Sequence, residues 1–85
     1  MKFDNRVQRS RHILTKMDRK IVTFIQEQEL DDRFSTINSL AYAIGTSPAT
    51  ITRFSNKLGY DNFQDMKFSV QHEKSEKIVE NAPLV

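Results

Sequence analysis

The polar side chains that could recognise a ligand gather in one short segment, residues 45–60, which reads GTSPATITRFSNKLGY. This segment carries hydroxyl, amide, guanidinium and ammonium groups, and it contains no acidic residue. Such groups donate hydrogen bonds and supply positive charge, so they suit contacts with base edges and phosphates better than bond-breaking chemistry. Whether they act together depends on the element that carries them, because only side chains on one face can meet one partner.

Groups suited to catalysis or metal binding are sparse. His12 and His72 lie far apart in the chain, and neither has a carboxylate or cysteine partner at a useful spacing. Asp31 and Asp32 are better explained as a solvated helix end than as a metal site. The sequence has no phosphate-binding loop and no nucleophile motif, and the absence of cysteine excludes disulfides and thiolate-based metal sites. We therefore expect no enzymatic activity, no cofactor and no metal.

Positive charge is concentrated in two stretches. The 85 residues carry a net charge of only +2, but residues 1–20 hold seven Lys or Arg residues against two Asp residues, a local balance of +5. Residues 34–60 hold Arg53 and Lys57 and no acid. The positive end of the molecule is thus expected to combine residues 1–20 with the segment 45–60. For residues 1–20 alone, a merely solvated charged face is an equally good explanation.

The length and hydropathy favour one small cytoplasmic domain. No apolar run approaches the roughly 20 residues that a membrane-spanning helix needs. The N-terminus is basic but lacks the apolar core of a secretory signal. We expect no membrane partner.

The apolar pattern is helical almost throughout, which predicts an all-α bundle of four or five helices. Thr15 and Asp18 have the spacing of a capping box, which predicts a helix that begins there and fades within residues 26–34. Ser35 or Thr36 is the expected cap of the next helix. An additional short helix before Thr15 is indicated by apolar residues at helical spacing.

The C-terminal part predicts one further helix, for which Asp61 and Gln64 are the expected capping pair. Beyond Gln71 the sequence becomes polar and is interpreted as a fraying helix end or a linker. The inner face of this helix is expected to consist of Phe63, Met66 and Val70.

Residues 36–58 have the pattern of a helix-turn-helix. Three residues beginning at Gly45 separate two short helices, and glycine can take the left-handed conformation that such a turn needs. The second helix, 48–58, starts with a Ser-Pro cap pair and ends before Gly59.

Helix 48–58 separates an apolar face from a polar one. Ile51, Phe54 and Leu58 cluster on the inner face. The outer face has no acid and no large apolar residue, which is the composition that a helix needs to enter the major groove. The expected base contacts come from Ala49, Thr52, Arg53 and Asn56. The expected phosphate contacts come from Ser47, Thr50, Lys57, Arg19 and Lys20.

The stretch LAYAIGTSPATITRFSNKLGYDNFQDMKFSV resembles the N-terminal DNA-binding domain of RpiR-type regulators, the bacterial regulators of sugar-phosphate metabolism. The resemblance covers residues 14–72, and its most specific part is the block from Ser47 to Phe63. It implies a five-helix domain, with the segment from Ser47 to Lys57 as recognition helix, joined to a larger domain that senses a phosphosugar.

This resemblance divides the chain into a DNA-binding domain, residues 1–77, and a linker or tail, residues 78–85. The tail would lead toward a sugar-phosphate-sensing domain that is absent from the 85 residues. A phosphosugar effector would act only through that domain. The expected partner of the chain itself is double-stranded DNA.

Two interpretations of the whole remain open at this point. The favoured one is a sequence-specific DNA-binding module that acts as a homodimer, because one small reader contacts few base pairs. The alternative is a helical protein-interaction or dimerisation module that contacts no nucleic acid.

Phe68 lies off the apolar stripe of its helix. Packing against the N-terminal segment is the favoured explanation, and a subunit or inter-domain contact is the other.

Overall fold

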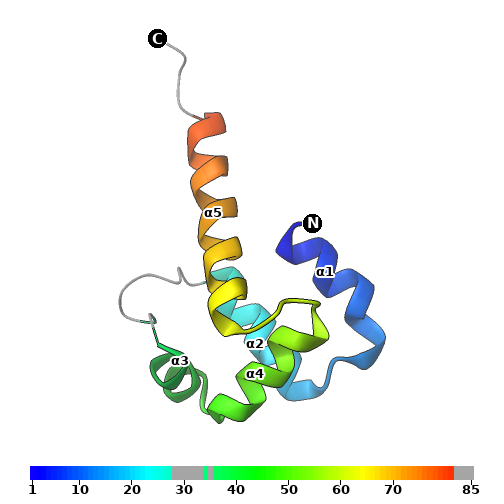
Figure 1. Cartoon of the computed structure of the whole chain (residues 1–85). Coiled ribbons are helices and arrows are strands. Elements are labelled where there is room, and N and C mark those ends of the chain that lie inside the picture. The colour runs from blue at the N-terminus through cyan, green and yellow to red at the C-terminus, as the bar shows by residue number, and fades with distance from the viewer. Residues whose placement is uncertain (28–33, 35, 82–85) are drawn as a thin grey trace.

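The computed structural model describes residues 1–27, 34 and 36–81, and for residues 74–81 it describes the backbone alone. This part of the chain forms five α-helices and a short 3-10 helix, with no strand (Figure 1). The all-α prediction is confirmed, and the additional N-terminal helix is present. The elements in chain order are α1 (Phe3–Ser10), η1 (Arg11–Ile13), α2 (Lys16–Glu27), α3 (Ile37–Ile44), α4 (Pro48–Lys57) and α5 (Phe63–Asn81).

Capping side chains set the start of α2 and α3. At α2, the Asp18 amide donates to Thr15 Oγ1 at 3.0 Å, and the Thr15 amide donates to Asp18 Oδ2 at 2.9 Å, which is the predicted capping box. At α3, Thr36 is the N-cap and exchanges equivalent bonds with Ser39. The other candidate cap, Ser35, lies outside the described residues.

The start of α5 differs from the prediction by one residue. Asn62, not Asp61, is the cap: its Oδ1 accepts from the Asp65 amide at 2.8 Å. Asp65 then reaches back to accept from the Asp61 amide at 3.0 Å, so Gln64 has no part in the cap. An asparagine side chain is as good a cap as an aspartate, and spacing alone cannot choose between neighbours.

The helix α5 also continues further than the predicted fraying point at Gln71. It runs to Asn81, because residues 72–81 contain no glycine or proline and are rich in Glu and Lys, which favour helix. Residues 78–81, expected to belong to a linker or tail, are therefore helical. Figure 1 shows α5 rising away from the other helices.

A single apolar core joins the helices. Its wholly buried members come from α2, α3, α4 and α5, and the ring of Phe54 lies 6.4 Å from that of Phe3 in α1. Burying a side chain of this size contributes roughly 1.5–3 kcal/mol. The predicted inner faces of α4 and α5 are confirmed, since all their members are buried: Ile51, Phe54, Leu58, Phe63, Met66 and Val70.

The turn between α3 and α4 has the predicted geometry. Gly45 adopts a φ of +87°, and the amides of Gly45 and Thr46 both donate to the Ala41 carbonyl at 2.9 Å. This pattern ends α3 and redirects the chain within three residues. Ser47 then caps α4, and Pro48 occupies its first turn, as predicted.

Phe68 does not pack against the N-terminal segment, and that explanation of its position is wrong. The side chain is 70% exposed on α5. Its ring is stacked on that of His72, with centroids 6.1 Å apart. The N-terminal segment contacts α5 five residues further along, where both carboxylate oxygens of Glu73 accept from the Phe3 amide at 3.0 and 3.1 Å.

Within the described residues, no helix combines the length and the apolar character that crossing a bilayer requires.

Candidate nucleic-acid interface

The helix α4 presents the predicted polar face to solvent. Ala49, Thr52, Arg53 and Asn56 are all exposed, whereas Ile51 and Phe54 on the other side are completely buried. The buried residues fix the rotation of the helix about its own axis. The structure therefore brings the four predicted base-contact residues onto one accessible surface.

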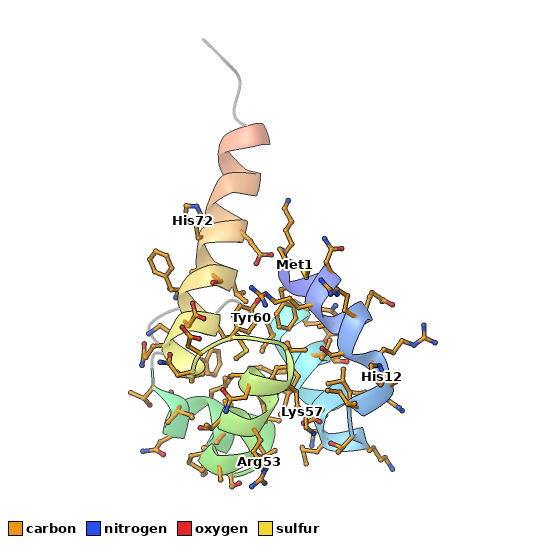
Figure 2. The ribbon with its side chains drawn as sticks, turned by 45° about the vertical axis from the view of Figure 1, so that its right-hand side comes forward. Met1, His12, Arg53, Lys57, Tyr60 and His72 are labelled. Atoms are coloured by element: carbon orange, nitrogen blue, oxygen red, sulfur yellow. The ribbon has the colours of Figure 1, made fainter. Side chains whose placement is uncertain are left out.

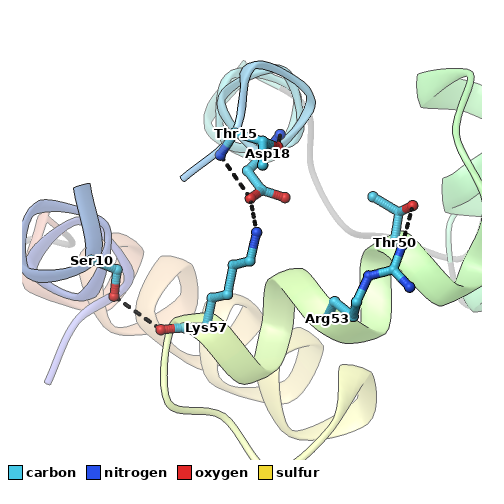
Figure 3. Close-up of polar contacts among 6 residues, drawn as sticks. All are labelled: Ser10, Thr15, Asp18, Thr50, Arg53 and Lys57. Carbon is cyan, nitrogen blue, oxygen red and sulfur yellow. Dashed lines mark hydrogen bonds and ion pairs between the residues drawn. The ribbon is translucent and has the colours of Figure 1, made fainter. Parts of the chain in front are cut away.

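The first turn of α4 is ordered by its own hydroxyl groups. Ser47 Oγ accepts from the Thr50 amide at 3.2 Å, and the two hydroxyl oxygens lie 3.0 Å apart. Arg53 Nη2 donates to Thr50 Oγ1 at 3.4 Å, so the guanidinium is directed toward the N-terminal end of the helix (Figure 3). Three predicted DNA-contacting side chains are thereby brought together beside a helix N-terminus, where the helix dipole favours an anion.

Lys57, a predicted phosphate contact, forms an ion pair inside the molecule. Its Nζ lies 2.5 Å from Asp18 Oδ2, joining the last turn of α4 to the capping box of α2 (Figure 3). Burial by itself would raise the pKa of Asp18, but hydrogen bonds from Lys57 and Thr15 outweigh it and hold the pKa below its usual value. The side chain of Lys57 remains 29% exposed.

The C-terminal end of α4 is held by α1, which the sequence analysis did not foresee. Ser10 Oγ donates to the Lys57 carbonyl, and Arg6 Nη1 donates to the Leu58 carbonyl, each at 3.0 Å. The Arg6 guanidinium also lies 4.3 Å from the centre of the Tyr60 ring. These bonds satisfy carbonyls that a helix end leaves without partners.

The side chain of Asn56 also serves the end of α4. With its amide nitrogen turned toward the chain that follows, it donates to the carbonyls of Tyr60 and Asp61 at 3.2 Å. Its amide oxygen then faces away from this turn. Asn56 remains exposed, and its amide oxygen is the atom left for a contact with a base.

Exposed cations on neighbouring elements flank α4. Arg19 and Lys20 are both exposed on α2. The Lys20 ammonium lies close to the helix-turn-helix turn, since a Cβ placed on Gly45 would be 3.9 Å from its Nζ. Among the described residues between 5 and 60, the acids are the buried, paired Asp18 and Glu27 at the far end of α2.

The chain resembles helix-turn-helix transcriptional regulators over most of its length. Residues 1–77 match the helix-turn-helix domain of the rpiR family. The chain is 35% identical over 63 residues to an HTH-type transcriptional regulator of Clostridium perfringens, itself uncharacterized. The alignment covers 74% of this chain but only 23% of that relative, so the chain spans less than a quarter of the relative's length. No solved structure matches the chain at a significant level.

Proposed function

The chain belongs to the rpiR family of helix-turn-helix domains, and we propose that it is the DNA-binding module of a transcriptional regulator, with α4 inserted in the major groove. The observation that carries this proposal is the outer face of α4. That face is exposed, has no acidic residue and begins with the small residue Ala49. Burial of the opposite face and bonds at the C-terminal end fix the position of the helix.

The base contacts follow from the chemistry of the four exposed side chains. Arg53 can donate two hydrogen bonds to a guanine, and the amide oxygen of Asn56 can accept one from the amino group of an adenine. The methyl groups of Thr52 and Ala49 can meet a thymine methyl and allow the helix backbone to come close to the bases. The preference for one base sequence over another is assigned mainly to Arg53, because bidentate contacts discriminate best between bases.

The phosphate contacts are assigned to the two ends of α4 and to α2. Ser47 and Thr50 offer hydroxyls beside the N-terminal amides of the helix. Arg19 and Lys20 supply charge along one edge. Lys57 is expected to contribute least, because its charge is already offset by Asp18.

The protein as a whole is proposed to be a cytoplasmic homodimeric regulator that responds to a phosphosugar. Two copies are needed because one α4 reads few base pairs, and paired half-sites supply the remainder. The effector would bind through a sensing domain outside these 85 residues, with residues 1–77 as the DNA-binding domain and residues 78–85 leading toward the sensor. No catalytic role is proposed for this chain.

The test is selection of a preferred site from a pool of random duplexes, followed by measurement of its affinity for three forms of the protein. Arg53→Ala should cost about 1–3 kcal/mol on the selected site and relax the base preference at one position. Arg53→Lys is the matched control, since it keeps the charge but cannot donate in the same bidentate manner. It should lose the base preference while retaining binding to unrelated duplexes.

Unchanged selectivity in Arg53→Ala would show that the orientation assigned to α4 is wrong. A chain that binds no duplex would instead favour the second candidate function, a protein-interaction or dimerisation module. That candidate has its own support in Phe68, an aromatic side chain held 70% exposed on α5.

A further inference from the structure

We propose that Arg9 binds a phosphate of the DNA backbone, in a depression between α1 and the C-terminal end of α4. This inference rests on the proposed function and adds to it a contact from a helix outside the helix-turn-helix. The lining of the depression comes from α1, from residues 57–59 and from Met1. It includes three cations, Arg6, Arg9 and Lys57, and no acidic side chain among its described members.

The end of α4 would by itself repel a phosphate, because the last carbonyls of a helix carry the negative end of its dipole. Two side chains of α1 offset this effect. Ser10 Oγ donates to the Lys57 carbonyl, and Arg6 Nη1 donates to the Leu58 carbonyl, each at 3.0 Å. Arg6 also brings a full positive charge to these carbonyls. The end of α4 that faces α1 can therefore accept an anion beside it.

Arg9 is the cation of this depression that has no counter-ion among the described residues. It lies three residues after Arg6 in α1, so the two side chains are neighbours on the helix surface. Arg9 is exposed, and its Nη1 lies 3.8 Å from Met1 Sδ, a weak and uncharged acceptor. Lys57 by contrast is paired with Asp18, and Arg6 is bonded to a carbonyl. The donors of Arg9 are therefore the ones available to a phosphate.

The depression adjoins the end of α4 opposite to the end that carries Thr50. Figure 2 shows Arg53 at the bottom of the view, Lys57 above it and Met1 above Lys57, and both Lys57 and Met1 line the depression. The ten residues of α4 place its two ends about 15 Å apart. This length exceeds the roughly 12 Å width of the major groove. With α4 in the groove, Arg9 and Thr50 would thus meet two different phosphates.

A phosphate held at each end would fix the orientation of α4 in the groove. Phosphate contacts set the position of a protein on the duplex without reading its sequence. The loss of Arg9 should therefore weaken binding to all duplexes alike. The loss of Arg53 should instead relax a base preference.

The first measurement is the slope of log affinity against log[salt] for a labelled random duplex. Arg9→Ala should reduce the magnitude of this slope by about 1, and it should bind about two- to fivefold more weakly at a fixed low salt concentration. Arg9→Lys keeps the charge and should restore most of the slope. Lys2→Ala is the matched control, because it removes an exposed positive charge at the start of α1, outside the depression, and it should leave the slope nearly unchanged.

The second measurement locates the phosphate. Single uncharged methylphosphonates are placed in turn along the duplex selected in the test of the proposed function. At the phosphate that Arg9 binds, the substitution should weaken the wild-type chain about two- to fivefold and leave Arg9→Ala unaffected. The same comparison with Thr50→Val should identify a different phosphate.

The inference is overturned if Arg9→Ala and Lys2→Ala change the slope equally. It is also overturned if Arg9→Ala remains sensitive at every methylphosphonate position, or if its insensitive position is the one found with Thr50→Val. In each case, salt-dependent binding and a base preference that requires Arg53 would leave the proposed function standing. A wild-type chain that binds no duplex would overturn the two together.

Discussion

The residues of the α4 surface differ in how much of their bonding capacity is already used. Thr52 and Ala49 are exposed to solvent on α4. Arg53 makes one long contact with Thr50, which it can leave at little cost. Lys57 by contrast holds a carboxylate that is 3% exposed, so moving its ammonium to a phosphate would leave a buried charge without its partner. We therefore expect the middle of α4 to contact the bases. The last turn of α4 is expected to hold the helix in place within the protein.

Asp18 should make the stability of the domain sensitive to acid. Because its pKa is lowered in the folded state, its contribution is complete above its ordinary value near 4 and is lost as the pH falls below that value. Asp18→Asn should therefore lower the free energy of unfolding by about 1–3 kcal/mol at pH 7, with a smaller difference near pH 3. Urea unfolding at several pH values measures this. Asp4→Asn, at an exposed position of α1, is the control and should have a small effect. An Asp18→Asn difference that is the same at every pH would contradict the assignment.

Tyr60 should make the stability of the domain sensitive to alkaline pH. Its hydroxyl is buried and has no hydrogen-bond partner among the described residues, and burial together with the charge of Glu73 raises the pKa to about 12. The unfolded chain therefore loses this proton first, and stability should fall between about pH 10 and 12, by up to about 1.4 kcal/mol per pH unit.

The variant Tyr60→Phe should remove this alkaline loss of stability and cost little at pH 8, because it deletes an unpaired buried hydroxyl. The control is Tyr42→Phe, since Tyr42 is 90% exposed. Thermal unfolding across this pH range compares the two. Parallel curves for Tyr60→Phe and the wild-type chain would show that the phenol is not the group responsible.

At the scale of the elements, the two left-handed glycines that end α3 and α4 offer a matched comparison. Both have a φ near +90°, so alanine at either position carries the left-handed strain of about 1–2 kcal/mol. At Gly45 the new Cβ meets only the Lys20 ammonium, at 3.9 Å. At Gly59 it would lie 2.9 Å from Arg6 Nη1, so Arg6 must move away from the Leu58 carbonyl.

Gly59→Ala should therefore destabilise the domain more than Gly45→Ala, by about 0.5–1.5 kcal/mol, the value of the lost hydrogen bond. This extra destabilisation by Gly59→Ala should disappear when both glycine variants also carry Arg6→Ala. Chemical denaturation of the two single and two double variants measures it. Equal costs for the two glycine substitutions would mean that the bond from Arg6 to the Leu58 carbonyl does not stabilise the end of α4.

The sequence predicts these elements well where local chemistry decides them. The Thr15–Asp18 box, the Ser47 cap and the two glycines are signals within a few residues, and the structure confirms each. The bonds that fasten α4 to other helices are not predictable in this way. Asp18 meets Lys57 across 39 positions, and Arg6 meets Leu58 across 52. Such pairs depend on the placement of whole helices, and seven basic residues in the first twenty give no sign that Arg6 is structural.

At the scale of the whole molecule, charge is separated along the described chain. Cations occupy η1, the first turn of α2 and the outer face of α4, where the nearest acid is buried and paired. Glu73 contacts the start of α1, and Asp61 and Asp65 lie at the start of α5. A duplex approaching α4 would thus meet positive charge on the elements around it, which should speed its association and make its affinity depend on salt.

The central claim is tested most directly by fluorescence anisotropy of a labelled random duplex titrated with this chain at several salt concentrations. With two to four phosphates contacted, log affinity should fall linearly with log[salt], with a slope of about −2 to −4. A labelled duplex whose anisotropy does not rise at the lowest salt concentration would contradict the claim that the α4 surface binds DNA.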